Sequence, residues 1–237
     1  GNKELSGSRE IVRIPVPETL TVSLCQHLGA PSTPVVKPGD KVAFGQVLGE
    51  RNGFISLPTH SPAAGKVVGV VEAPMPHRRT GPAVVISVES AEEAPAFEPW
   101  PYWGNRTPEE LTDRIRDAGV CGMGGACFPT FIKLSPPPDK RIDTLIINGA
   151  ECEPYLTADY RLMLESPDDV IEGMRILAAV LRVENPCIGI EVNKPDVIGL
   201  MKKNGVRVVA LRTSYPQGAE KQLVHAVCRR KVPAGGL

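Results

Sequence analysis

Three segments of this chain combine glycine with polar or aromatic residues that suit planar or phosphorylated ligands. The first, residues 122–130 (Gly-Met-Gly-Gly-Ala-Cys-Phe-Pro-Thr), has glycine at three of its first four positions. Because glycine lacks a Cβ atom, such a loop can approach a ligand closely and present free backbone amides to it. The loop does not fit the Walker pattern, and it lacks the preceding strand of the dinucleotide fingerprint. Taken alone, it is equally compatible with a simple connector.

The second segment, Asn-Gly-Ala-Glu-Cys-Glu-Pro at residues 148–154, follows the most apolar stretch of the chain. The side-chain amide of Asn148 offers both a donor and an acceptor, which suits the pyrimidine edge of an isoalloxazine ring. Glu151 and Glu153 would be costly to bury without partners. The structural alternative is a pair of solvated acids in a turn.

The third segment, Tyr-Pro-Gln-Gly-Ala-Glu-Lys-Gln-Leu at residues 215–223, lies where a predicted strand gives way to a helix. Its structural alternative is an ordinary helix start with Glu220 in the first turn, where the helix dipole favours an acid. Three ligand-compatible loops at matching ends of one sheet are more informative together than separately.

Composition excludes several other classes. The 27 basic residues equal the 27 acidic ones, so no net charge draws the chain to nucleic acid or an anionic membrane. The six cysteines form no Cys-x-x-Cys, which argues against a zinc site, a disulfide framework or a self-contained iron–sulfur cluster. We find no apolar stretch of the roughly 18–20 residues that a membrane span needs, and no signal peptide at the start. Any membrane association is therefore expected through a partner.

The elements that must position these loops follow two different patterns. Residues 11–90 predict short strands separated by turns, as at Pro38-Gly39-Asp40 and at Asn52-Gly53. Residues 91–107 are proline-rich and lack periodicity. We therefore predict an all-β domain at 10–90, a linker at 91–107 and a second domain at 108–237.

The second domain is predicted to alternate strands and helices. Thr107, Pro108 and Glu110 form a capping box that begins a helix, which ends at Gly119. Such alternation indicates a mainly parallel, Rossmann-like sheet with ligands at the carboxyl ends of its strands. The predicted strands are 144–148, 187–192 and 206–211, and the predicted helices that follow them are 166–181, 195–203 and 219–228.

The residue pattern resembles known families in both halves. Lys-Pro-Gly-Asp-Lys-Val, Gly-Gln-Val-Leu and Ser-Pro-Ala-Ala-Gly-Lys-Val resemble the barrel-sandwich hybrid fold of biotinyl and lipoyl carriers. No lysine stands between Lys41 and Lys66, so the modified lysine of those carriers is missing. The three loops, in order and spacing, resemble the C subunit of Rnf ion-translocating ferredoxin:NAD oxidoreductases. They resemble more distantly the flavin subunit of respiratory complex I.

The resemblance implies a site for FMN and NAD(H), with hydride passing between nicotinamide and flavin and no acid–base residue required. Electrons would then move singly to or from iron–sulfur clusters. On this resemblance, the FMN-binding residues would be Gly122, Gly124, Gly125, Lys133, Asn148, Glu151, Tyr215, Gly218 and Glu220, and the nicotinamide side would hold Phe128 and Glu153.

Some positions depart from the family. Cys127 stands where the family usually has glycine, and complex I flavin proteins have acids at the positions of Ala150 and Ala219. The family also continues past Leu237 into further flavin-site loops and a ferredoxin-like segment that binds the 4Fe-4S clusters. We therefore expect the clusters only in that missing region, and we expect this fragment to be inactive alone.

The resemblance implies a peripheral subunit on the cytoplasmic side of the cell membrane. Its partners would be the membrane subunits of the Rnf complex and the ferredoxin-like B subunit. Two alternatives remain open at this point. One is the flavin domain of a related NADH-dependent reductase, such as cobalamin reductase, and the other is a non-catalytic docking domain.

Overall fold

The computed structural model describes residues 1–75, 78–90 and 98–233. Its chain forms two compact units: a β unit of residues 14–137, and an α/β unit that combines residues 1–13 with 138–237. Within the expected linker at 91–107, residues 91–97 lie outside the described residues. The rest of that segment is irregular apart from the short 3-10 helix η1 (Trp103–Asn105).

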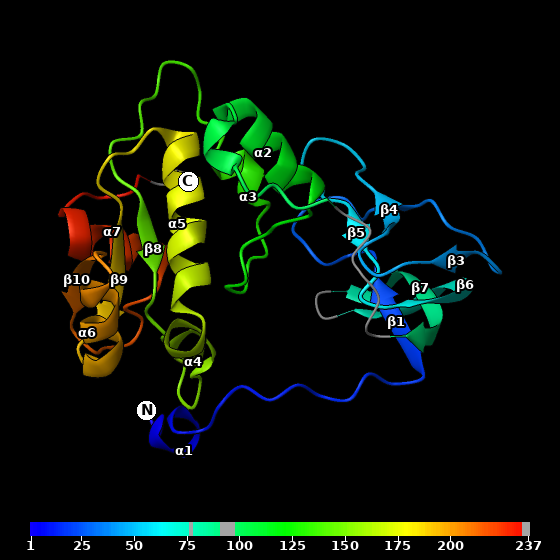
Figure 1. Ribbon diagram of the computed structural model, residues 1–237, viewed down its shortest axis with the longest axis horizontal. Helices are drawn as coiled ribbons and strands as arrows, with labels where there is room; N and C mark the ends of the chain where they lie inside the picture. The colour runs from blue at the N-terminus through cyan, green and yellow to red at the C-terminus, as the bar shows by residue number, and fades with distance from the viewer. Residues whose placement is uncertain (76–77, 91–97, 234–237) are drawn as a thin grey trace. The chain divides into compact units, whose positions relative to one another are not determined.

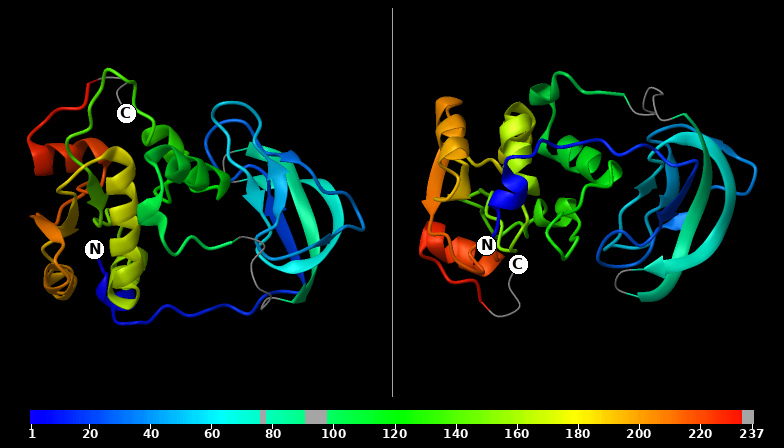
Figure 2. Two further views of the ribbon diagram at one scale, coloured as in Figure 1. Left: turned by 45° about the horizontal axis from the view of Figure 1, so that its top comes forward. Right: turned by 90° about the horizontal axis from the view of Figure 1, so that it is seen from below.

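Antiparallel strands build the β unit, as the sequence predicts. One sheet has the order β1 (Thr19–Ser23), β7 (Arg78–Ser90), β6 (Ala64–Met75) and β3 (Lys41–Val42). A second sheet joins β2 (Thr33–Pro34), β4 (Val47–Glu50) and β5 (Thr59–His60). Figure 2 shows how strongly β6 and β7 curve. Their curvature encloses a core of small aliphatic side chains, among them Leu24, Leu48, Val67, Val84 and Ile86.

The Asn52-Gly53 pair lies in the predicted hairpin but does not form a two-residue turn. Strands β4 and β5 pair antiparallel through a connection of residues 51–58. Inside it, Arg51 Nε donates to Ser56 O at 3.1 Å and Asn52 N donates to Ser56 Oγ at 2.9 Å. Gly53 has φ +91°, a conformation that favours glycine. These side-chain contacts stabilise a longer loop than the dipeptide alone favours.

Helix α2 (Pro108–Asp117) begins where the capping box predicts. Thr107 Oγ1 accepts from Glu110 N at 3.2 Å, and Thr107 N donates to Glu110 Oε2 at 2.8 Å. Helices α2 and α3 (Thr130–Lys133) fall in the β unit, since the compact units divide after residue 137. The sequence instead indicates that the second domain begins at residue 108. The expected domain limits of 10–90 and 108–237 therefore stay predictions.

The α/β unit has the predicted parallel sheet. Its strand order is β10 (Arg207–Leu211), β9 (Cys187–Glu191) and β8 (Ile146–Asn148), with β9 paired in parallel to both neighbours. Figure 1 shows these strands side by side among their helices. The helices are α1 (Glu4–Gly7), α4 (Ala158–Glu165), α5 (Pro167–Leu181), α6 (Pro195–Lys203) and α7 (Glu220–Cys228).

Alternating side chains of the strands build a separate core on each face of this sheet. Ile188 and Ile190 of β9 belong to one core, where residues of α4, α5 and α6 pack with them. Leu211 of β10 belongs to the other core and packs with Leu223 of α7. Gly189 of β9 faces this contact, and a Cβ atom on it would come within 2.9 Å of both leucines. Helix α7 can therefore pack closely on β9 because residue 189 has no side chain.

The apolar spacing of Val170, Met174, Leu177 and Leu181 predicts that these residues form the buried face of α5, and the structure differs slightly. Met174 is buried as the spacing predicts, but Ile171 and Ala178 complete the face in place of Leu177 and Leu181. Helix α4 is absent from the sequence prediction. No described helix is long and apolar enough to cross a membrane.

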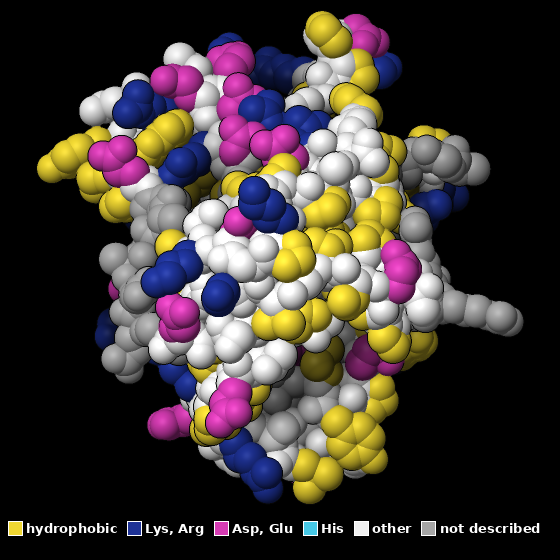
Figure 3. Space-filling view, turned by 90° about the vertical axis from the view of Figure 1, so that its right-hand side faces the viewer, with side chains coloured by type: hydrophobic (Ala, Val, Ile, Leu, Met, Phe, Trp, Pro, Cys, Tyr) yellow, Lys and Arg dark blue, Asp and Glu magenta, His cyan; other side chains and the backbone are white. Residues whose placement is uncertain are grey.

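Part of the β unit's apolar surface is exposed. Figure 3 looks onto this unit and shows hydrophobic side chains grouped on the visible face. Apolar patches of this kind are common on proteins, and they gain meaning only when large and contiguous. The exposed apolar residues of the β strands and their loops include Val35, Phe54, Ile55, Val68, Val70 and Val71.

Candidate functional site

The loops after β8 and β10 meet at the carboxyl end of the sheet. Asn148, the last residue of β8, donates through Nδ2 to the carbonyl of Gly218 at 2.9 Å. Its Oδ1 accepts from Ala150 N at 3.2 Å. One side chain thus fixes its own turn and holds the second loop, 70 residues further along the chain. The amide nitrogen and the amide oxygen each make one bond within the protein.

Gly218 lets the two loops approach closely. Its backbone N–H donates to Cys152 Sγ at 3.0 Å. A Cβ atom at this position would lie 2.8 Å from Ala150 O and 2.9 Å from Cys152 Sγ, closer than real Cβ contacts. Any side chain here would therefore push the loops apart. Tyr215, at the start of the same loop and joined to Pro216 by a cis peptide bond, is 72% exposed.

Glu151 has a different environment from the one its motif suggested. Its carboxylate has no exposed surface. Oε1 accepts from the backbone amides of Asp159 and Tyr160, at 2.7 and 3.1 Å, in the first turn of α4. Oε2 lies 3.0 Å from Lys194 Nζ. The side chain therefore connects the loop after β8 to a helix start and to the loop after β9.

Lys194 is the centre of a buried charge cluster. Its ammonium lies between Glu151 and Glu191, whose Oε2 is 3.5 Å away, and all three residues are at most 3% exposed. Within the described chain, the facing atoms have no well-directed hydrogen bond, so the attraction is electrostatic. Lys3 adds a second cation, with Nζ 3.5 Å from Glu151 Oε2. Two carboxylates and two ammonium groups thus balance in charge.

The cluster influences neighbouring titrating groups. Burial raises the pKa of Asp159, and the negative charge of Glu151 raises it further, while Lys194 and Lys3 oppose the shift. A hydrogen bond from Tyr160 OH to Asp196 Oδ2, 2.5 Å long, is the main cause that raises the pKa of Tyr160. The start of α4 is therefore held by fixed charges on several sides. Such an arrangement can keep a ligand loop rigid.

The remaining predicted residues of the α/β unit are accessible. Glu153 lies in the turn after Glu151 and is exposed, and Glu220 is the exposed first residue of α7. Neither is part of the buried cluster. The structure thus brings Asn148, Glu151 and Gly218 together at one end of the sheet.

The glycine loop belongs to the β unit. Cys121 pairs with Pro129 as an isolated bridge, and Gly122 N donates to Phe128 O at 2.9 Å. Between these contacts the loop projects outward, and Met123 is 92% exposed. A Cβ atom at Gly124 or Gly125 would meet no heavy atom within 4 Å. Packing within the described chain therefore does not require glycine at either position.

The other predicted residues near the glycine loop differ in exposure. Phe128 is partly buried at the loop's base, while Lys133 is the exposed last residue of α3. Gly125 and Cys127 adopt positive φ of +61° and +46°. At Cys127 this conformation favours the glycine that the resembling family has there. Cys127 O also accepts from Leu28 N at 2.9 Å, which fixes that end of the loop.

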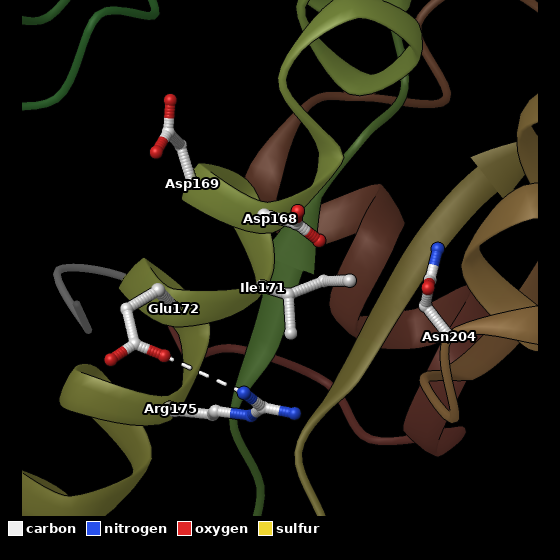
Figure 4. A pocket seen from close by; sticks show the side chains of 6 residues that line it. All are labelled: Asp168, Asp169, Ile171, Glu172, Arg175 and Asn204. Atoms are coloured by element: carbon white, nitrogen blue, oxygen red, sulfur yellow. Dashed lines mark ion pairs between the residues drawn. The ribbon is translucent and has the colours of Figure 1, made fainter.

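Two hollows are lined by residues other than the predicted ones, although the second includes Cys121, next to Gly122. Figure 4 shows one of about 350 Å³ between α5 and the end of α6, where Ile171 and Asp168 point toward Asn204. Asp169, Glu172 and Arg175 complete its rim, so carboxylates outnumber the single guanidinium. This charge opposes a phosphorylated ligand. The second hollow, of about 220 Å³, is in the β unit and includes His60, whose pKa is lowered chiefly by burial.

Three buried or half-buried residues of the charge cluster were missed by the sequence interpretation. They are Lys3, Glu191 and Lys194, which share no local motif. Lys194 follows the strand end at Val192, a loop that the predicted topology does mark as a ligand position. No comparable signal identifies Lys3, because its partner is 148 residues away.

Comparisons with known proteins match the two halves of the chain separately. Residues 1–91 match a model described as the RnfC barrel sandwich hybrid domain, and residues 115–237 match the Nuo51 FMN-binding domain. A curated relative in Clostridium ljungdahlii is the C subunit of a proton-translocating ferredoxin:NAD(+) oxidoreductase complex. It is 44% identical over 100% of this chain and 53% of its own length. The Na(+)-translocating counterpart of Acetobacterium woodii is 42% identical over 93% of this chain and 51% of its length.

The chain spans about half the length of these two relatives. A solved structure, the NAD+-reducing NiFe-hydrogenase in its air-oxidized state, is similar over 50% of this chain and 23% of its own, with 23% identity and a TM-score of 0.45. The expected resemblance to the Rnf C subunit is confirmed by the relatives' names. Since one family model covers more than half of the residues, the chain belongs to the Nuo51 FMN-binding domain family.

Proposed function

We propose that this chain is the FMN- and NAD(H)-binding part of the C subunit of a ferredoxin:NAD oxidoreductase complex that translocates ions. One observation carries the proposal. Asn148 and Gly218 join the loops after β8 and β10 at the carboxyl end of a parallel sheet. Cofactors bind at this end in open α/β sheets. The loops lie within the region that matches an FMN-binding family.

The residues of the glycine loop fit a flavin nucleotide. Gly124 and Gly125 leave open space where side chains would stand, so a planar ring or a phosphate can approach the backbone. Lys133 supplies a cation that suits a phosphate. FMN, when bound, would accept a hydride from NADH and release its electrons one at a time.

The roles of individual residues follow from their exposure. Gly122, Gly124, Gly125 and Lys133 would bind FMN, and Phe128 and Glu153 would border the nicotinamide. Asn148 would fix the loop geometry through its bonds within the protein, and its second amide hydrogen and second oxygen lone pair could meet the ligand. Because the carboxylate of Glu151 is enclosed, we propose that it supports the flavin site rather than touching the ring. Tyr215, Gly218 and Glu220 are further residues that we propose to contact FMN.

The remaining parts of the function lie outside this sequence. The 4Fe-4S clusters would be bound by segments of the longer protein, so residues 1–237 alone would lack an outlet for electrons. The proposed partners are the membrane subunits of the complex and its ferredoxin-like B subunit. They would hold the protein at the cytoplasmic face of the membrane as a peripheral subunit.

Flavin binding by the full-length protein tests this proposal. We expect purified protein to show flavin absorbance, or to gain it and a higher melting temperature with FMN, because a ligand of the folded state stabilises it. NADH should then bleach the absorbance. Saturating FMN without a spectral or thermal change would contradict the proposal and favour the docking-domain alternative. Reduction of a corrinoid instead of ferredoxin would favour the cobalamin reductase alternative.

A further inference from the structure

The first eleven residues of the chain clamp the loop that follows Glu151. Tyr155 N donates to Gly1 O at 2.8 Å, and Ser6 Oγ donates to Tyr155 O at 2.8 Å. Further along, Ile11 N donates to the carboxylate of Glu165 at 3.0 Å. The segment therefore runs along the 151–157 loop and onto α4, and all of these contacts lie within the α/β unit.

Lys3 makes the most specific of these contacts. Its Nζ donates to the carbonyls of Glu151 and Leu156, each at 2.8 Å, and lies 3.5 Å from Glu151 Oε2. The two carbonyls stand at the two ends of the loop that contains Glu153. One ammonium group thus joins both ends of this loop. Its side chain is only 18% exposed; the bond to the carbonyl of Glu151 is partly buried, and the bond to Leu156 lies at the surface.

Lys3 also completes the charge balance of the buried cluster. Glu151 and Glu191 share the single interior cation Lys194, which leaves one negative charge in excess. Buried charges are tolerated when they are paired. The charge of Lys3 offsets this excess beside Glu151, whose carboxylate caps α4.

We propose that Lys3 is a positioning residue for the nicotinamide side of the site, acting by joining the ends of the loop that presents Glu153. This inference rests on the proposed function, because Glu153 is placed beside nicotinamide only there. The glycine loop that would hold FMN belongs to the other compact unit. Glu151 also keeps its contacts with the Asp159 and Tyr160 amides and with Lys194 when Lys3 is replaced. Loss of Lys3 is therefore expected to weaken NADH binding more than flavin binding.

The test compares Lys3→Met with Lys3→Arg and with Lys203→Met in the full-length protein. Methionine keeps the length and apolar stem of lysine but has neither charge nor donor. Lys203, exposed in the last turn of α6, provides the matched control. Hydrogen exchange at the Asp159 and Tyr160 amides reports on the Glu151 cap without any cofactor. Steady-state NADH oxidation with ferricyanide as acceptor reports on the site.

We expect Lys3→Met to accelerate exchange at both amides and to raise the KM for NADH by about tenfold, with kcat and flavin content near those of the parent. In Lys3→Arg the KM for NADH should return part of the way to the parent value. In Lys203→Met both the KM and the exchange rates should match those of the parent. If Lys3→Met does not fold, Ser6→Ala removes only one contact of the clamp and should raise KM by a smaller factor.

Two results would overturn the inference. One is unchanged exchange at Asp159 and Tyr160 in Lys3→Met. The other is a loss of flavin with an unchanged KM for NADH. Failure of the proposed function would look different, because the parent protein itself would then bind no FMN while the exchange comparison would still report on the clamp.

Discussion

The glycines of this chain serve two opposite purposes. Gly218 is required by packing within the protein, because a Cβ atom would enter the space of Ala150 O and Cys152 Sγ. Gly124 and Gly125 have nothing within 4 Å of the same position. In the first case glycine allows two segments of protein to meet, and in the second it leaves surface open for something else. Open space alone does not indicate a ligand, since Gly39 and Gly53 also meet nothing within 4 Å, but only the second kind leaves room for one.

The surroundings of these glycines differ as well. The loops after β8 and β9 are held by buried charges at Glu151, Glu191 and Lys194. The glycine loop is held at its base, by backbone bonds at Gly122 and Cys127. We expect substitutions near the cluster to change the stability of the fold, and substitutions in the glycine loop to change ligand binding.

The largest expected effect is that of Lys194→Met. It removes the cation shared by two buried carboxylates, and breaking a buried pair in this way costs about 3–5 kcal/mol of unfolding free energy. Urea denaturation followed by circular dichroism measures the loss, and Lys203→Met serves as the control. A loss below about 1 kcal/mol, the range of an exposed pair, would show that the cluster does not stabilise the unit.

Gly218→Ala comes next and tests the packed glycine. The added Cβ would force the loops after β8 and β10 apart, at a cost of about 1–3 kcal/mol. The same denaturation experiment should show this loss whether or not FMN is present. An alanine variant as stable as the parent would mean that the loops separate easily and that Asn148 does not fix their distance.

Gly124→Ala tests the open glycine. Its stability should stay within about 0.5 kcal/mol of the parent, since the new methyl group meets no atom of the protein. FMN affinity of the full-length protein should fall by about tenfold, or about 1.4 kcal/mol, because the methyl group would occupy ligand space. Equal affinity in a fluorescence titration would remove the loop from the site. Gly125→Val should go further and abolish FMN retention, with some cost to the fold from its positive φ.

The smallest effect contrasts an exposed ion pair with the buried cluster. Arg230 donates to both carboxylate oxygens of Asp143, at 2.8 and 2.9 Å, and together with Thr144 lowers the pKa of Asp143 from 3.8 to about 2. Because the pKa of Asp143 is lower in the folded protein, its ionised carboxylate stabilises the fold at pH values above the ordinary pKa. This stabilisation is lost as the pH falls from about 4 to about 2. In Arg230→Gln, an NMR titration should find the pKa of Asp143 closer to 3.8. An unchanged pKa would show that the pair does not form in solution.

Local signals predicted most of the regular structure. The capping box placed α2, and helix α6 and the parallel strands begin and end within about two residues of their predicted bounds. These signals depend on residues only a few positions apart, so they can be identified from a short segment of the sequence. The buried face of α5 was predicted less accurately, because tertiary packing buries Ile171 and Ala178 more deeply than Leu177 and Leu181.

Long-range features could not be predicted in this way. The sequence indicated that Asn148 and the Tyr215 loop share one end of the sheet, but not that Gly218 is the contact between them. Glu151 was expected to face a ligand, yet its burial depends on Lys3 and Lys194, which are distant in the chain. A local sequence motif that contains a carboxylate does not predict which distant cations will pair with it.

The α/β unit is interrupted in sequence, because residues 1–13 belong to it and residues 14–137 do not. During synthesis, the first segment leaves the ribosome long before the residues it binds. The entropic cost of closing a loop grows only slowly with its length, by about 0.6 kcal/mol for each doubling, and a folded β unit in between shortens the effective loop. We therefore expect the β unit to fold first during translation, and the α/β unit to be completed only when the residues after Asn148 have emerged.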